Sequence, residues 1–332
     1  MPVFASTEEL YEVLTPYYRS LTTDPDIGEE TLAPTAGGSV EPALQLCSQA
    51  ARSSGDDPAG TAAAFSSFLL LDHRQAWSAN AAEDAVARLA PEAAAAVNAT
   101  PALRAFAIRN VQPRSTTDFP AAFGGVAGSD GHLVRWARRP EREQLQELLQ
   151  QPKAQQRSNE QQPLFGVCTN GRRDRCCAIV GRGIAVGLHA DFGDRVVEIS
   201  HLGGHRYAGT MLVLPWGYAY GFLDLAGASA IAAAAYQGLV HPDGLRGRAD
   251  LAPAAQAADV LLRREIGPAA PAAVRILGVE QKPNAPGAHR VRAEVLGEPC
   301  SVLMRRTPGS TVELTVCGGK PFSTGSWTMA RL

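Results

Sequence analysis

Apolar positions along this chain recur at two different periods, which predict alternating strands and helices. Residues 103–111 and 132–137 alternate between apolar and polar side chains, as expected of strands. Residues 176–189 place their apolar side chains at helical spacing instead. Short apolar runs predict further strands at 164–168, 195–200, 211–215 and 218–223. The order strand, helix, strand, strand, strand indicates an α/β or α+β fold for this part of the chain.

The same patterns continue on both sides of that block. Helical signals lie at 8–18, 41–52, 81–99, 226–237 and 252–266, and 61–73 has the pattern of a buried element. Terminal strands are predicted at 274–279, 289–296, 301–306 and 311–317. The segment 141–163 is rich in Gln and is expected to end a helix and continue as a solvated linker. We therefore expect three parts, at 1–150, 164–225 and 226–332.

Composition limits the class of protein but does not assign a function. Apolar residues make up 45% of the 332 residues and charged residues 19%, so buried cores are expected. A net charge of −2 argues against a nucleic-acid-binding protein that relies on overall basicity. We find no apolar stretch long enough to span a membrane and no export signal at the start, so we expect a cytoplasmic protein. Arg outnumbers Lys 28 to 3, which is typical of a GC-rich bacterial coding bias.

Two thiols and two imidazoles stand in two loops that each adjoin a predicted strand. Cys168 and Cys177 lie at the two ends of the first loop, and His201 and His205 lie in the second. Gly203 and Gly204 separate the two histidines, so a folded-back loop is expected rather than a helix. No Glu follows His201, which excludes the HExxH arrangement of metalloproteases.

These donors suit zinc, copper or an iron–sulfur centre. A zinc knuckle usually spaces its cysteines two to four positions apart. Here eight residues separate Cys168 from Cys177, and seven separate it from Cys176. The wide loop favours a two-iron cluster over one ion. A Rieske centre alternates Cys and His within each loop, and this chain does not.

The segments CTNGRRDRCCA at 168–178 and SHLGGHRYAGTMLVLP at 200–215 resemble the sucrase/ferredoxin-like family. The blocks 47–52 and 55–62 share this resemblance. It implies a thioredoxin-like α/β core with an N-terminal α/β region and a C-terminal appendage of helices and antiparallel strands. It also implies a [2Fe–2S] cluster. The implied ligands are Cys168, Cys177, His201 and His205.

The implied function is single-electron transfer between donor and acceptor proteins that the sequence does not identify. Two neutral imidazoles in place of thiolates should raise the reduction potential above that of plant-type ferredoxins. The second N–H of each imidazole could couple electron transfer to proton transfer, which a midpoint potential independent of pH would contradict. An acidic partner is expected to face the arginines near the loops. These are Arg172, Arg173, Arg175, Arg182 and Arg206.

Several alternatives stay open at this point. The four donors could hold a structural Cys2His2 zinc ion, or Cys176 and Cys177 could serve a thiol–disulfide protein on a thioredoxin-like scaffold. An enzyme whose cluster serves another pocket is a further alternative, although the pattern favours an electron carrier or redox sensor. No carboxylate pair is placed for glycoside hydrolysis. The register of the family favours Cys177 over Cys176 as the second thiolate, and a strained vicinal disulfide is also conceivable. We interpret Cys47, Cys300 and Cys317 as packed thiols.

Overall fold

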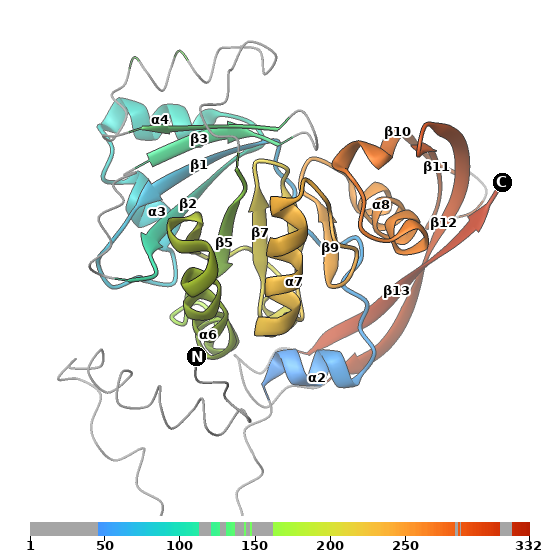
Figure 1. The fold of residues 1–332 in the computed structure, drawn as a ribbon, viewed down its shortest axis with the longest axis horizontal. Helices are drawn as coiled ribbons and strands as arrows, with labels where there is room; N and C mark the ends of the chain where they lie inside the picture. The colour runs from blue at the N-terminus through green and yellow to red at the C-terminus, as the bar shows by residue number, and fades with distance from the viewer. Residues whose placement is uncertain are drawn as a thin grey trace, which may run out of the picture. The chain divides into compact units, whose positions relative to one another are not determined.

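The structure is a computed structural model that describes residues 46–112, 121–126, 131–136, 143, 147, 162–282, 285, 287–312 and 321–332. The helix expected at 8–18, most of the Gln-rich segment and Cys317 lie outside these residues. Within them, a nine-stranded mixed sheet and a separate four-stranded antiparallel sheet form the framework (Figure 1).

The first half of the large sheet comes from residues 67–136. Its strands are β1 (Ser67–Asp72), β2 (Leu103–Asn110), β3 (Ala121–Gly125) and β4 (His132–Trp136). Helices α3 (Ala81–Val86) and α4 (Pro91–Ala99) connect the parallel strands β1 and β2. Strand β3 then pairs antiparallel with β1, and β4 pairs antiparallel with β3.

The second half comes from residues 164–248. Its elements are β5 (Leu164–Cys168), α6 (Arg175–Phe192), β6 (Val196–Ile199), β7 (Met211–Leu214), β8 (Tyr218–Tyr220), α7 (Leu225–Tyr236) and β9 (Leu245–Arg248). Helix α6 connects the parallel strands β5 and β6, and β7 and β8 follow antiparallel. Helices α6 and α7 lie side by side in Figure 1, next to β5 and β7. This βαβ–ββα order agrees with the thioredoxin-like core that the resemblance implies.

The two halves repeat one topology. The sheet order is β4-β3-β1-β2-β6-β5-β7-β8-β9, so β2-β1-β3-β4 has the same sequence of neighbours as β6-β5-β7-β8. Strands β2 and β6 join the halves in an antiparallel pair. Ile108 and Ile199 face each other there, and each is also the partner of the last residue of its parallel neighbour, Asp72 or Cys168. The pair Ile108/Ile199 therefore marks the approximate twofold axis of the repeat.

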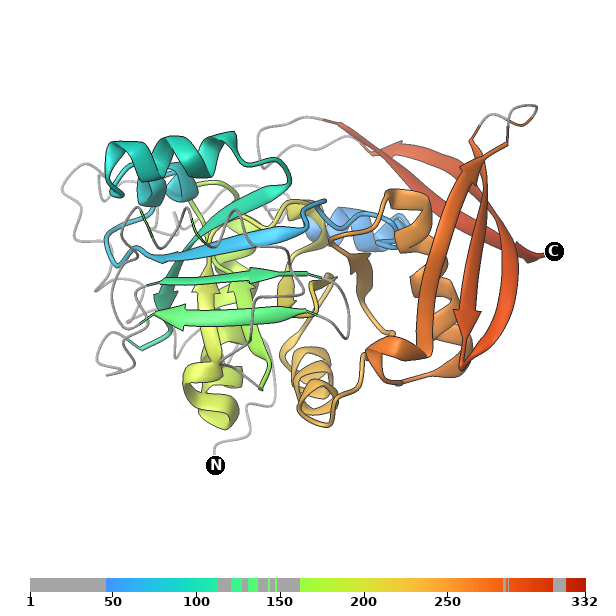
Figure 2. The same ribbon diagram turned by 90° about the horizontal axis from the view of Figure 1, so that it is seen from above.

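The C-terminal sheet wraps around one helix. It contains β10 (Val274–Gln281), β11 (Ala288–Val295), β12 (Glu298–Val312) and β13 (Phe322–Arg331), all paired antiparallel in sequence order. Helix α8 (Pro253–Ile266) lies against its inner face (Figure 2). Apolar residues of α8 such as Leu262 pack there against Val291, Val302 and Met304.

Helix α6 meets the length and hydropathy criteria for a membrane span over residues 175–195. In the structure it connects two adjacent parallel strands, and Ile184, Ala185 and Leu188 pack into the core beside the sheet. A right-handed βαβ crossover requires an apolar face on its helix, because that face covers the sheet. We therefore assign α6 as a core helix of this domain.

The mixed α/β fold predicted from the sequence is confirmed. The single helix expected over 81–99 is wrong, because the chain breaks before Pro91 and restarts as α4. Strands β3, β9 and β13 were not predicted. The boundaries at 150 and 225 stay a prediction, and the large sheet continues from β4 to β9 across both of them.

Candidate metal centre

Parallel pairing of β5 and β6 places two of the expected ligands at one edge of the sheet. Cys168 is the last residue of β5 and pairs with Ile199, the last residue of β6. His201 follows two residues later. Because the carboxyl ends of parallel strands lie at the same edge, the topology brings Cys168 and His201 together.

The first turn of α6 brings Cys177 to the same edge, since a crossover helix begins where its strand ends. Asp174 caps this helix, and its side-chain Oδ1 accepts a hydrogen bond from the Cys176 backbone N–H at 2.9 Å. Gly181 allows close packing, because a Cβ there would lie 2.0 Å from the carbonyl oxygen of Cys168. The spacing of Cys168 and Cys177 thus follows from a strand end, a short loop and a capped helix.

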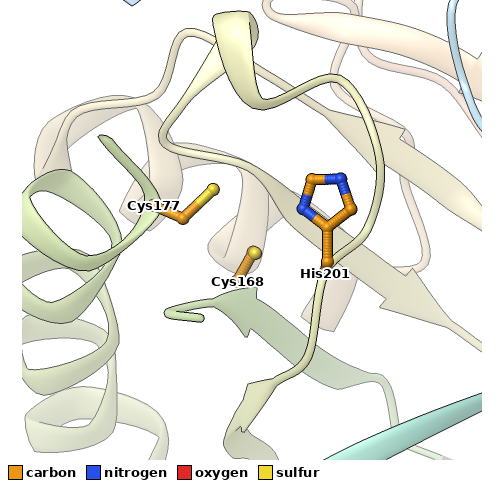
Figure 3. A group of neighbouring side chains, drawn as sticks. All are labelled: Cys168, Cys177 and His201. Atoms are coloured by element: carbon orange, nitrogen blue, oxygen red, sulfur yellow. The ribbon is translucent and has the colours of Figure 1, made fainter. Parts of the chain in front are cut away.

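Cys168, Cys177 and His201 form a compact group of donors. One donor atom from each residue lies within 4.8 Å of the other two. Figure 3 shows both sulfur atoms and one ring nitrogen of His201 directed toward a common space. The His201 Nδ1 atom is buried and has no hydrogen-bond partner among the described residues. An unpartnered buried nitrogen is costly, and a metal bond would relieve that cost.

The two thiols at this site have opposite pKa shifts. The pKa of Cys168 lies well below its usual value, and the largest cause is the contact with the side chain of Cys177. His201 and the backbone N–H groups of Leu202 and Asn170 lower this pKa further. The same contact with Cys168, together with burial, raises the pKa of Cys177. The contact between the two thiols therefore favours the thiolate on Cys168 over that on Cys177, and the thiolate is the form that binds a metal.

The loop that carries both histidines is fixed by arginines. Gly203 and Gly204 have positive φ values of 83° and 70°, which confirms the expected folded-back loop. The buried Arg246 donates a hydrogen bond to the carbonyl oxygen of Gly203 at 2.8 Å. Arg104 donates to the carbonyl oxygen of His201 at 3.0 Å. Both contacts restrict the backbone next to the imidazoles.

The structure places His205 close to this group but with other partners. Its ring centroid lies 6.5 Å from that of His201. Its Nδ1 atom lies 2.8 Å from an Asp174 carboxylate oxygen and 3.4 Å from the sulfur of Cys47. Asp174 accepts this hydrogen bond and raises the pKa of His205, although burial opposes the effect. His205 begins the short 3-10 helix His205–Tyr207, and its side chain is 42% exposed.

A second group of donors lies beside the first. The sulfur atoms of Cys47 and Cys176 are 3.1 Å apart, and donor atoms of Cys47, Asp174 and Cys176 all lie within 4.8 Å of one another. Cys47 comes from helix α2 (Cys47–Ser53). The adjacent residues Cys176 and Cys177 thus point into different groups, and only Cys177 joins Cys168 and His201.

Three of the five arginines expected near the site lie exposed along its first loop or at the start of α6. They are Arg172, Arg173 and Arg175. The other two pair with carboxylates elsewhere. Arg182 contacts the buried Glu198, and Arg206 donates to Asp56 at 2.8 Å.

Sequence reasoning missed four contributors to this site. It placed Arg104 and Arg246 in no motif, treated Cys47 as a packed thiol, and did not identify Asp174 as the N-cap of α6. Arg246 and Cys47 reach the site from distant parts of the chain, so no local pattern identifies them. Asp174 had one local signal, because an Asp directly before a helix is a common N-cap.

The donor set fits a metal group that takes thiolate and imidazole ligands. Cys168 and Cys177 supply sulfur, and His201 supplies an unpartnered nitrogen. Zinc and iron–sulfur centres both accept such ligands. His205 completes a set of four only if its ring turns away from Asp174.

The comparisons with known proteins agree with this chemistry. The family model described as sucrase/ferredoxin-like matches residues 58–247, which is more than half of the chain and includes both donor loops. No curated protein and no solved structure gives a significant match. The match over this length shows that the chain belongs to the sucrase/ferredoxin-like family.

Proposed function

We propose that this protein transfers single electrons through a [2Fe–2S] cluster held by Cys168, Cys177, His201 and His205. The observation that carries the proposal is the convergence of two sulfur atoms and the unpartnered His201 nitrogen within 4.8 Å. Membership of a ferredoxin-like family supports a redox role. When bound, such a cluster accepts and returns one electron at a time.

The residues around the donors suit that role. Cys168 is fully buried, and the contact with Cys177 lowers its pKa and so favours the thiolate, the form that binds a metal. Arg104 and Arg246 anchor the carbonyl groups of His201 and Gly203. Their fixed positive charges should favour the reduced, more negative state. Replacement of two thiolates by imidazoles acts in the same direction on the reduction potential.

A structural zinc site is the second candidate, and one observation favours it. The donor atoms of Cys168, Cys177 and His201 all lie within 4.8 Å of one another, which is compact enough for a single tetrahedral ion. His205 would then complete a Cys2His2 set. The two candidates differ in metal content and colour, so one preparation can decide between them.

The deciding experiment is metal and sulfide analysis of protein purified without oxygen, followed by electron paramagnetic resonance after dithionite reduction. We expect about two irons and two labile sulfides per chain and a reduced-state signal. Zinc in equimolar amount without labile sulfide would instead support the structural site.

The ligand assignment has its own test. In the double variant His201→Cys/His205→Cys, the g-values should move toward those of an all-thiolate centre. His241→Cys is the matched control, because this histidine accepts a hydrogen bond from the Asp243 N–H outside the site. Unchanged g-values in the double variant with full iron content would refute the two histidine ligands.

The remaining expectations complete the proposal. We place the protein in the bacterial cytoplasm as an electron carrier or redox sensor rather than an enzyme. The exposed arginines Arg172, Arg173 and Arg175 would meet an acidic donor or acceptor protein. Coupling of electron transfer to a proton through the imidazole ligands stays a prediction, and the dependence of the midpoint potential on pH tests it.

A further inference from the structure

The pair Cys47 and Cys176 is not used by the proposed electron transfer, and its geometry is unusual for two packed thiols. Both residues are 0% exposed, and their sulfur atoms are 3.1 Å apart. Sulfur atoms that only touch are held farther apart than this by their size, whereas a disulfide bond brings them to about 2.05 Å. The remaining distance is about 1 Å, which small side-chain rotations can cover.

We propose that Cys47 and Cys176 form a reversible disulfide, which gives this chain a two-electron thiol switch beside its candidate metal centre. The switch removes no ligand of that centre, because Cys177 and not Cys176 points to Cys168 and His201. It connects helix α2 to the first turn of α6, next to the loop that carries His205.

The oxidant in this reaction is another disulfide, and glutathione disulfide is the reagent used to test it. The two S–H bonds of Cys47 and Cys176 break and one S–S bond forms between them. The two electrons and two protons pass to glutathione disulfide, whose S–S bond breaks to give two glutathione thiols. Reduction by glutathione runs the same exchange backwards, through a mixed disulfide.

One partly exposed side chain and one short helix lie next to the buried pair. His205 lies 3.4 Å from the Cys47 sulfur, and its side chain is 42% exposed. Helix α2 has only seven residues, and Cys47 is its first residue. Local opening of so short a helix costs less than global unfolding, so we expect a thiol reagent to reach the pair in the folded protein.

The experiment uses the full chain as purified, equilibrated with glutathione buffers that range from reducing to oxidising. Remaining thiols are alkylated, and the peptides are mapped by mass spectrometry. We expect a linked species that joins the peptides of Cys47 and Cys176, is lighter by two hydrogens, and increases as the buffer becomes more oxidising. Reducing buffer should restore both alkylated thiols.

Variants identify the partners, since Cys176 and Cys177 stand side by side. Cys47→Ser and Cys176→Ser should each abolish the linked species, whereas Cys300→Ser, a control in the C-terminal sheet, should leave it unchanged. The bond would close a loop between residues 129 positions apart, so oxidation should raise the urea midpoint of the wild type but not of Cys47→Ser.

Three outcomes would overturn the proposal: alkylation of both cysteines at every buffer ratio, separate attachment of glutathione without a link, or a link that involves Cys168 or Cys177. Mapping of the wild-type protein decides even if a variant fails to fold. Iron and sulfide are measured on the same samples, so an absent cluster would count against the proposed function and leave this test intact.

Discussion

Asp174 shows how one side chain can serve both a helix and a site. It caps α6 through the Cys176 N–H and accepts a hydrogen bond from His205. Burial alone would raise the pKa of Asp174, but the contacts with His205 and Cys176 outweigh burial and lower it. The lowered pKa favours the charged carboxylate, which holds the His205 ring through this hydrogen bond.

Replacement of Asp174 separates these two roles. We expect Asp174→Ala to lower the free energy of unfolding by more than about 1 kcal/mol, the usual cost of a lost N-cap. Asp174→Asn keeps a capping side chain and loses only the charge beside the half-exposed His205, so it should cost under about 1 kcal/mol. Urea unfolding measures both variants.

Asp224→Ala is the matched control for this pair, because Asp224 caps α7 through the Gly227 N–H and has no histidine partner in the described contacts. If Asp174→Ala lowers the free energy of unfolding no more than Asp224→Ala does, the contact between Asp174 and His205 contributes nothing to the stability of the folded protein.

The pair Asp57 and Arg264, which includes none of the proposed metal ligands, gives stability a pH dependence of its own. Burial would raise the pKa of Asp57, but hydrogen bonds from Arg264 and the Ala59 N–H lower it below its unfolded value. A lowered carboxyl pKa stabilises the fold above the unfolded pKa of about 3.9, and this contribution is lost as the pH falls through the folded pKa. Because Arg264 is 36% exposed, solvent screening keeps the contribution under about 1 kcal/mol.

Asp57→Asn should therefore destabilise the protein at pH 7 and have progressively less effect below about pH 4. Urea unfolding of wild type and variant at several pH values measures the difference. A difference that is constant from neutral to acidic pH would contradict the role of the Asp57 charge.

At the scale of elements, the contact between α6 and the end of β5 sets the spacing of the two thiols. Gly181 lies against the carbonyl group of Cys168, and that carbonyl group cannot move away unless strand β5 shifts with it. At Gly187, six positions later on the same helix, the three atoms nearest to an added Cβ all belong to the flexible side chain of Leu225, which is 43% exposed. The two glycines therefore have different structural roles despite their shared helix.

Gly181→Ala should cost about 1–3 kcal/mol through overpacking and should lower the metal content by moving Cys177 relative to Cys168. Gly187→Ala should be nearly neutral, since Leu225 can move and Ala favours the helix by up to about 1 kcal/mol. Urea unfolding and metal analysis of both variants test this difference. Equal effects of the two substitutions would show that close packing of α6 on β5 is unimportant.

The sequence predicted most elements of the core block correctly, because they are short and their periods are clear. The helix over 176–189 and the strands around it appear as α6, β5, β6, β7 and β8. Periodicity failed where Pro91 divided an Ala-rich stretch and where β3, β9 and β13 carried weak alternation. Strands of that kind form because neighbouring strands pair with them, and their own side chains give little signal.

At the scale of the whole molecule, the joint between the two repeated halves depends on a buried carboxylate. Glu198 on β6 is 1% exposed and pairs with Arg109 of β2 at 2.6 Å. Arg182 of α6 contacts the other carboxylate oxygen, Oε1, whereas the Thr169 hydroxyl donates to Oε2, the oxygen that Arg109 contacts, at 2.7 Å. One side chain therefore links both halves of the sheet, α6 and the first donor loop.

Glu198→Ala should lower the free energy of unfolding by about 3–5 kcal/mol, because it leaves partly buried arginine charge without its partner. Glu294→Ala is the control, since the Arg275–Glu294 pair is exposed and should contribute under about 1 kcal/mol. Urea unfolding compares the two. A loss from Glu198→Ala as small as that from Glu294→Ala would show that this network does not hold the halves together.

The sequence by itself determined the residue types, their two loops and the α/β class, because each depends on local spacing. Only the tertiary structure decided that His205 contacts Asp174, that Cys47 touches Cys176, and that two halves of one topology meet at Ile108 and Ile199. These contacts join residues far apart along the chain. Local periodicity carries no record of such partners, because packing and strand order select them only when the whole chain folds.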